Sequence, residues 1–118
     1  MLLLVGCGSS VQSKTEYQKI TVEQAAELMS KGESVTLDVR TKEEYDAGHI
    51  KGAILLPYDE IKKDASITPL PDKNQTVLVY CRTGMRSEIA ARELISMGYT
   101  NVFDFGGIVD WPGEIVLD

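Results

Sequence analysis

Cysteine and histidine are scarce in this sequence, which has two cysteines, Cys7 and Cys81, and one histidine, His49, among 118 residues. Two cysteines are too few for a disulfide framework, and no group of cysteine and histidine has the spacing of a zinc site. The sequence also shows no internal repeat and no apolar run long enough to span a bilayer. We therefore expect no metal and no cofactor, and the chemistry has to come from Cys81 and its surroundings.

Positive charge is also in short supply, because 12 lysines and arginines stand against 18 acidic residues and leave a formal net charge of −6. A surface that binds nucleic acid needs a basic face to neutralise phosphates, and no basic stripe is present, so we expect no nucleic-acid partner. The apolar share of 43% and the charged share of 25% are ordinary for a globular protein. The length has room for one domain with a single core.

The stretch around Cys81 is the most informative part of the sequence. An apolar run, Val77 to Tyr80, ends at Cys81, and the next five residues have no acidic side chain. Ser87 then opens an amphipathic segment, Glu88 to Met97. This order predicts a buried strand, a tight loop and a helix, with the thiol at the base of the loop.

The predicted surroundings of Cys81 favour a reactive thiolate. The first N–H groups of the helix and the positive end of its dipole would point back at the sulfur. Arg82 and Arg86 add two cations. Cations and helix N-termini lower the pKa of a thiol and turn it into a nucleophile. The alternative is that Cys81 is a small apolar residue that ends a core strand.

Three further stretches form a pattern together with this loop. In order along the chain they are Leu37–Arg40, Gly48–Ala53 with Pro57, the loop Cys81–Ser87, and Gly106–Ile108 with Trp111. In these residues the chain resembles the rhodanese (sulfurtransferase) family, from about Ile20 to the C-terminus. The resemblance implies that Cys81 is the catalytic nucleophile. It also implies that the loop binds the substrate through Arg82, Thr83, Gly84, Met85 and Arg86.

Strand-like and helical segments alternate over the whole of residues 19–118, which we expect to form one domain. Strands are predicted at 19–20, 34–40, 53–56, 77–81 and 101–105, and helices at 22–31, 41–48, 59–63 and 88–97. Two helix starts carry capping boxes, Thr21 with Gln24 and Thr41 with Glu44. The alternation predicts an α/β sandwich around a mainly parallel sheet, and the resemblance implies three α/β/α layers with five strands. Ligands of such sheets bind at the carboxyl ends of strands, where Cys81 falls.

The N-terminal residues do not belong to the predicted domain. Leu4-Val5-Gly6-Cys7 resembles the lipobox that ends a bacterial lipoprotein signal, in which the cysteine carries a lipid anchor. We expect residues 1–6 to be a truncated signal of this type, without its basic region, and residues 7–18 to be the lipidated Cys7 and a flexible linker. The resemblance implies a cell-envelope location, on the periplasmic or extracytoplasmic face, with membrane contact only through Cys7. The alternative is a frayed apolar end or an edge strand with a buried Cys7.

Other polar residues near the predicted site have structural interpretations. His49 lies in a predicted turn, 48–52, and the resemblance places this motif in the scaffold, so a structural imidazole is favoured over a general base. Asp38 and Arg40 lie at a strand end and could approach the crevice of Cys81, but a carboxylate beside a thiolate opposes its ionisation. We expect a structural ion pair instead, between Arg40 and Glu43 or Glu44.

The resemblance implies a thiosulfate-type sulfurtransferase that works through a Cys81 persulfide. Its partners would be a small-molecule donor such as thiosulfate and a cyanide or thiol acceptor, a protein thiol included, and we expect a monomer. One alternative is a cysteine phosphatase or arsenate reductase. Arg86 follows Cys81 one position earlier than the arginine of the related phosphatases does, which narrows the loop. The other alternative is a non-catalytic sulfur-carrier or redox module.

Overall fold

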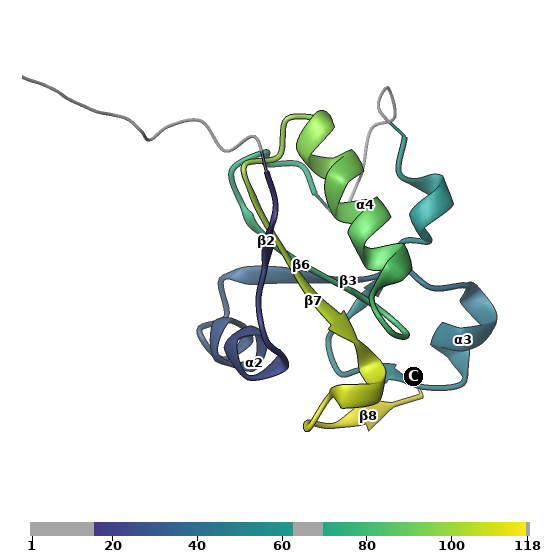
Figure 1. The fold of residues 1–118 in the computed structure, drawn as a ribbon. Coiled ribbons are helices and arrows are strands. Elements are labelled where there is room, and N and C mark those ends of the chain that lie inside the picture. The colour runs from purple at the N-terminus through teal and green to yellow at the C-terminus, as the bar shows by residue number, and fades with distance from the viewer. Residues whose placement is uncertain (1–15, 63–69, 118) are drawn as a thin grey trace, which may run out of the picture.

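A five-stranded sheet forms the centre of the domain in the computed structural model, which describes residues 16–62 and 70–117 (Figure 1). The strands lie in the order β2-β7-β6-β3-β5, and every neighbouring pair is parallel. In chain order they are β2 (Gln18–Lys19), β3 (Ser34–Asp38), β5 (Ile54–Leu55), β6 (Thr76–Cys81) and β7 (Asn101–Gly107). Because β6 is the middle strand, Cys81 lies at the carboxyl end of the centre of the sheet.

Helices and two short strands surround this sheet. The α-helices are α2 (Val22–Ser30), α3 (Lys42–Asp46) and α4 (Met85–Ser96), and the 3-10 helices are η1 (Tyr58–Glu60) and η2 (Ile108–Asp110). The short strands β4 (His49–Ile50) and β8 (Ile115–Val116) pair with each other in antiparallel fashion. The segment that follows η2 is therefore tied back to the scaffold beside His49.

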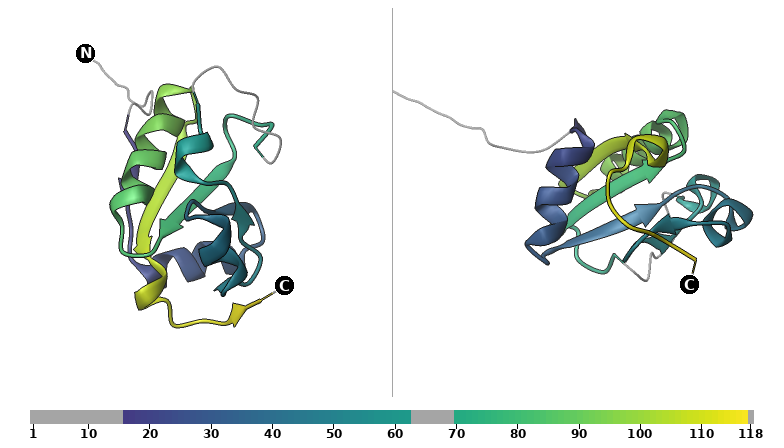
Figure 2. Two further views of the ribbon diagram at one scale, coloured as in Figure 1. Left: turned by 90° about the vertical axis from the view of Figure 1, so that its right-hand side faces the viewer. Right: turned by 90° about the horizontal axis from the view of Figure 1, so that it is seen from below.

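The side chains of β6 point alternately to the two faces of the sheet, and this explains the layers of the fold. Val77, Val79 and Cys81 belong to the core beneath α4, whereas Leu78 and Tyr80 belong to the core beneath α2. All five side chains are at most 1% exposed, as expected for a central strand covered on both faces. Figure 2 shows the helices on the two sides of the sheet. The predicted α/β/α sandwich with five parallel strands is thus confirmed.

Both predicted capping boxes are present. The N–H of Gln24 donates to the Thr21 hydroxyl at 3.0 Å, and the N–H of Thr21 donates to the Gln24 side chain at 2.8 Å. Thr41 and Glu44 make the same pair of bonds at the start of α3. Each box satisfies N–H groups that the first helical turn leaves without partners, so these two starts were readable from local sequence.

Helix α4 begins earlier than the sequence predicted. Its first residue is Met85 rather than Glu88, because Gly84 takes φ 125° and acts as the N-cap. A φ of this sign suits glycine, which has no Cβ, and it lets the chain turn directly from the loop into the helix. Met85 and Arg86 therefore belong to the first turn of α4, and the loop proper is shorter than predicted.

Several short elements also differ from the predictions. His49 and Ile50 form a strand, where a turn was predicted over 48–52, and the turn is confined to residues 51–52. The strand predicted at 53–56 is shorter in the structure, where only β5 forms. Of the helix predicted at 59–63, the structure shows the single turn η1, and residue 63 lies outside the described residues. Elements this short carry little periodicity, so contacts with distant segments decide their form.

The partner predicted for Arg40 was wrong, since Arg40 pairs with Asp38 and not with Glu43 or Glu44. Its Nη2 lies 2.6 Å from Asp38 Oδ2, and the Tyr80 hydroxyl donates to the same oxygen at 2.6 Å. Arg40 is 6% exposed and Asp38 is fully buried. Buried charges persist when they are paired and hydrogen-bonded in this way. The pair is therefore structural and joins the ends of β3 and β6, rather than lining the crevice.

The predictions for the N-terminus lie mainly outside the described residues. The signal at 1–6, the lipid anchor on Cys7 and the cell-envelope location therefore stay predictions. The linker predicted to reach residue 18 ends earlier, because Tyr17 packs against the core and Gln18 begins β2. Among the helices of residues 16–62 and 70–117, none has the length and apolar character needed to cross a membrane.

Candidate active site

Cys81 ends β6 on the side of the sheet that α4 covers, and it is 1% exposed. The backbone N–H of Gly84 donates to its Sγ at 3.0 Å. This bond comes from the N-cap residue of α4, at the positive end of the helix dipole. An N–H donor at a helix N-terminus stabilises a thiolate and any other anion formed at the sulfur.

The end of β7 packs directly against the loop. Gly107 lies so close to it that a Cβ at this position would be 2.8 Å from the Thr83 Cα and would also meet the carbonyl oxygen of Arg82. In η2, the Val109 N–H donates to that same carbonyl at 3.5 Å. The glycine motif near the C-terminus, which the resemblance singled out, therefore forms one wall of the loop around Cys81.

Arg86 is held by a carboxylate from a different helix. Its Nη1 and Nη2 donate to the two oxygens of Glu44 at 2.7 and 2.9 Å. This two-pronged geometry is the strong form of an arginine–carboxylate pair. The sequence analysis did not identify Glu44 as a partner of Arg86, because it interpreted Glu44 as a capping residue and as a candidate partner of Arg40. A capping box gives no sign of a second partner 42 residues away.

The pair shifts the ionisation of both groups. Hydrogen bonds from Arg86 lower the pKa of Glu44 from 4.5 to about 2; partial burial opposes the shift and bonds from Thr41 add to it. The hydrogen bonds to the Glu44 carboxylate raise the pKa of Arg86. Over the pH range in which proteins are stable, both partners are therefore charged.

We expect Glu44→Gln to destabilise the fold at neutral pH but not in strong acid. A carboxylate whose folded pKa lies below its unfolded value stabilises the fold above the unfolded pKa, and this contribution is lost as the pH falls from 4.5 to about 2. For a partly exposed pair the loss at neutral pH should be about 0.5–1 kcal/mol. Urea unfolding of both proteins at a series of pH values measures the difference. Glu43→Gln is the control, since Glu43 makes no ion pair among the described residues, and a pH-independent difference for Glu44→Gln would contradict this account.

The other residues predicted to bind substrate lie at the surface around the loop. Arg82 and Thr83 are exposed, Met85 is 75% exposed, and Gly84 is partly covered. Within the part of the chain that the structure describes, Arg82 forms no ion pair. Because Glu44 neutralises Arg86, Arg82 is the loop cation whose charge is uncompensated. The loop thus combines a buried sulfur with one exposed guanidinium.

His49 lies in the scaffold. It is 2% exposed, its Nδ1 is 2.9 Å from the carbonyl oxygen of Tyr45, and its ring stacks on the Tyr45 ring with centroids 3.7 Å apart. An imidazole enclosed in this way has no route to a substrate at the loop. The described ranges contain no group of three or more side chains placed to hold a metal ion.

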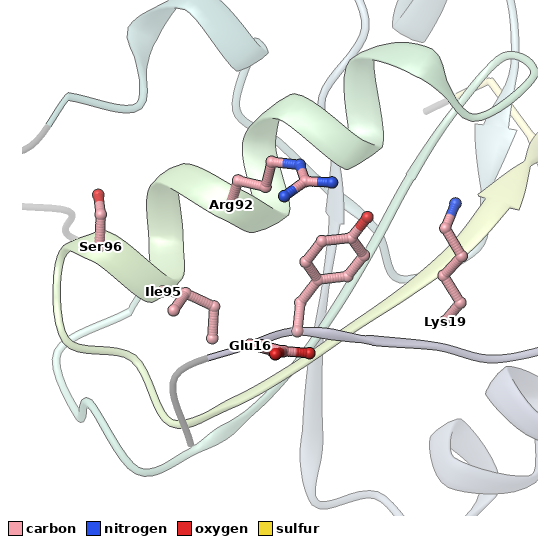
Figure 3. A pocket seen from close by; sticks show the side chains of 6 residues that line it. Glu16, Lys19, Arg92, Ile95 and Ser96 are labelled. Atoms are coloured by element: carbon pink, nitrogen blue, oxygen red, sulfur yellow. The ribbon is translucent and has the colours of Figure 1, made fainter. Parts of the chain in front are cut away.

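Two hollows lie along the edge strand β2. One, of about 350 Å³, borders the loop and is lined by Thr83, Gly84, Met85, Lys19, Glu88 and Asp104 among others. The other, of about 560 Å³, lies between β2 and α4, and Figure 3 shows Lys19 on one side of it and Arg92 and Ile95 on the other. The larger hollow extends to Ser96 at the end of α4 remote from Cys81, and the Arg92 guanidinium is bonded to Glu88 at 2.9 Å. The smaller hollow is therefore the one that bears on the candidate active site.

Comparison with known proteins agrees with this geometry. The model of the Rhodanese-like domain family matches residues 21–114. The chain is 46% identical over 74 residues to thiosulfate sulfurtransferase PspE of Escherichia coli (strain K12), a match that covers 63% of this chain and 70% of PspE. It is 32% identical over 99 residues to thiosulfate sulfurtransferase GlpE of Coxiella burnetii, covering 83% of this chain and 90% of GlpE. A solved structure of a rhodanese with anions from E. coli superposes with a TM-score of 0.66 at 41% identity, over 72% of this chain and 99% of that one.

Proposed function

Because the chain belongs to the rhodanese-like domain family, we propose that it is a thiosulfate-type sulfurtransferase with Cys81 as its nucleophile. The observation that carries the proposal is the Gly84 N–H bonded to Cys81 Sγ at 3.0 Å, at the N-terminus of α4. Two relatives are named thiosulfate sulfurtransferases, and the similar E. coli rhodanese was solved with anions. These findings support a thiol that reacts as an anion with anionic donors.

The proposed reaction has two steps in which the enzyme is neither oxidised nor reduced overall. The Cys81 thiolate attacks the outer sulfur of thiosulfate, a bond forms between Sγ and that sulfur, and sulfite leaves with the electron pair of the donor's sulfur–sulfur bond. A cyanide ion or a thiolate then attacks the outer sulfur of the Cys81 persulfide, and the Cys81 thiolate is regenerated. Sulfite is a stable leaving anion that needs no proton, which fits a loop without a histidine.

The residues of the loop have separate roles in this proposal. The Gly84 N–H and the α4 dipole stabilise the negative charge on the sulfur of Cys81 in both its thiolate and persulfide forms. Arg82 is exposed and its charge is uncompensated, so it binds the sulfonate oxygens of the donor. Arg86, which the sequence assigned to the substrate, instead fixes the first turn of α4 through Glu44 and adds little net charge.

A cysteine phosphatase or arsenate reductase is the weaker candidate. Such enzymes direct an arginine at a tetrahedral anion, whereas both outer nitrogens of Arg86 are bonded to Glu44. The shorter spacing from Cys81 to Arg86 also narrows the loop that surrounds the sulfur. A narrower loop favours a single persulfide sulfur over a phosphate placed for in-line attack. A misfit of about 1 Å costs on the order of a hundredfold in rate. We expect hydrolysis of p-nitrophenyl phosphate to be negligible.

Mass spectrometry of the intact protein tests the proposal. Incubation with thiosulfate should add the mass of one sulfur atom at Cys81, and cyanide should remove it again with formation of thiocyanate. Phosphatase turnover greater than thiocyanate turnover would overturn the assignment. A persulfide that forms and then fails to turn over with cyanide or any thiol would instead identify a sulfur carrier without transferase activity.

A further inference from the structure

Asp104 is a buried carboxylate next to the active-site loop that the proposed reaction does not use. It lies on β7, is 2% exposed, and lines the hollow beside the loop. Its Oδ1 accepts hydrogen bonds from the Ser87 hydroxyl at 2.7 Å and from the Gly106 N–H at 2.9 Å. Its Oδ2 has no hydrogen-bond partner among the described residues. The nearest cation, Lys19 Nζ, lies 3.9 Å from this oxygen, which is an ion-pair distance but too long for a hydrogen bond.

A short series of contacts connects Asp104 to the sulfur. Ser87 is fully buried, and its Oγ lies 3.0 Å from the carbonyl oxygen of Gly84. The N–H of the same Gly84 donates to Cys81 Sγ. Asp104 therefore holds the Ser87 side chain against Gly84, the residue whose N–H donates to the sulfur. Through Gly106 it also fixes the end of β7, which packs against the loop.

We propose that Asp104 is a positioning residue for Cys81, which acts through Ser87 and Gly84 and whose negative charge is offset by Lys19. The inference rests on the proposed role of Cys81 as the nucleophile. It concerns a residue that neither touches the sulfur nor belongs to the loop. Two separable effects follow from it: an acceptor oxygen that holds the loop in place, and a charge that acts on the thiolate.

The two effects have opposite consequences for Cys81. As an acceptor, Asp104 favours activity, because it holds Ser87 and Gly106 in the arrangement that presents the Gly84 N–H to the sulfur. As a buried anion, it disfavours the thiolate, since a negative charge in a poorly solvated site opposes a second one nearby. The ammonium group of Lys19 reduces that penalty. Lys19 itself is 68% exposed, so removing it should change charge far more than packing.

Other charged groups surround the loop and remain unchanged in the test. Arg82 and Arg86 lie on the loop and the first turn of α4, Glu44 reaches Arg86 from α3, and Glu88 lines the same hollow as Asp104. Tyr58 of η1 also interacts with Arg86 and is not substituted in these variants. Differences between variants at Asp104 and Lys19 therefore report those two charges.

The first experiment is alkylation of Cys81 by iodoacetamide as a function of pH, in a Cys7→Ser background so that Cys81 is the only thiol. Asp104→Asn keeps an acceptor oxygen and removes the charge, so alkylation near pH 6 should become about twofold to tenfold faster. Lys19→Gln should make it slower by a similar factor. Lys51→Gln is the matched control, because Lys51 is 71% exposed and pairs with Glu114 away from the loop. Shifts in the same direction, or no shift in either variant, would overturn the inference.

The second experiment separates position from charge by comparing two substitutions of one residue. Asp104→Ala removes the acceptor for Ser87 and Gly106, so thiocyanate formation should fall at least about tenfold. Asp104→Asn retains an acceptor and should restore most of the rate. Equal loss in the two variants would contradict a positioning role. Alkylation needs no sulfur donor, so opposite pH shifts without any sulfur transfer would refute the proposed function and leave this inference standing.

Discussion

Cys81→Ala is expected to reduce thiosulfate:cyanide sulfur transfer by more than about a thousandfold, to the uncatalysed level. Alanine cannot form the persulfide, and no second thiol occurs among the described residues. The fold should survive, because removing one buried sulfur atom from the core beneath α4 costs on the order of 1 kcal/mol. Thiocyanate formation measures the loss, and thermal unfolding followed by circular dichroism verifies that the domain is intact.

The other cysteine of the chain provides the control for this variant. Cys7→Ser should retain full sulfur transfer, since the proposed reaction needs only the thiol at the end of β6. After thiosulfate treatment, Cys7→Ser should gain one sulfur atom in mass and Cys81→Ala should gain none. Substantial transfer by folded Cys81→Ala would remove the basis of the assignment.

The parts of the site that could be predicted are those that local sequence specifies. The apolar run before Cys81, the glycine after it and the amphipathic segment beyond fix a strand, a loop and a helix within a few residues of each other. The two capping boxes are equally local, and both are present. Alternation along β6 also determines that Cys81 shares a face with Val77 and Val79 beneath α4.

The parts that could not be predicted are contacts between distant segments. Glu44 reaches Arg86 across 42 positions, and Asp104 reaches Ser87 across 17. In the sequence, the capping box already accounts for Glu44, so nothing indicates a further partner. Asp104 lies in a predicted strand, and a strand pattern does not identify the hydrogen-bond partner of a carboxylate. Both acids reach the loop from outside it. The composition of the loop, which has no acidic residue, was therefore not enough to predict the charges near the sulfur.

The negative charges of Glu44 and Asp104 near the loop change the role expected of each cation. Glu44 neutralises Arg86, and Lys19 lies near Asp104, so neither cation is free to attract a donor on its own. Arg82, the residue that follows Cys81, is left as the exposed cation of the loop. The donor affinity should therefore depend more on Arg82 than on Arg86, whereas the geometry of the first turn of α4 should depend on the Arg86–Glu44 pair.

Gly107→Ala is expected to lower sulfur transfer by on the order of a hundredfold while the domain remains folded. Gly107 has φ −134°, an extended conformation open to any residue, so alanine causes no backbone strain of its own. The added Cβ would instead lie 2.8 Å from the Thr83 Cα and would collide with the carbonyl group of Arg82. These neighbours are backbone atoms, which cannot move aside by a change of rotamer, so the loop itself has to shift.

A shift of this kind separates activity from stability. Arg82 and Thr83 are exposed, so the loop can move outward with little loss of buried surface, at a cost of about 1–3 kcal/mol. The Gly84 N–H would move with it and lose its alignment with Cys81 Sγ, which lies 3.0 Å away in the native site. Since the sulfur depends on that alignment, the rate should fall much further than the stability.

Gly52→Ala is the matched control for this prediction. Gly52 lies in the turn after β4 with φ 89°, and a Cβ there meets no atom within 4 Å, so alanine costs about 1 kcal/mol of backbone strain and leaves the loop untouched. Thiocyanate formation should then separate the two variants, with Gly107→Ala about a hundredfold less active and Gly52→Ala fully active, whereas urea unfolding should show both moderately destabilised. If Gly107→Ala kept its activity, the packing of β7 against the loop would not be what aligns the Gly84 N–H with the sulfur of Cys81.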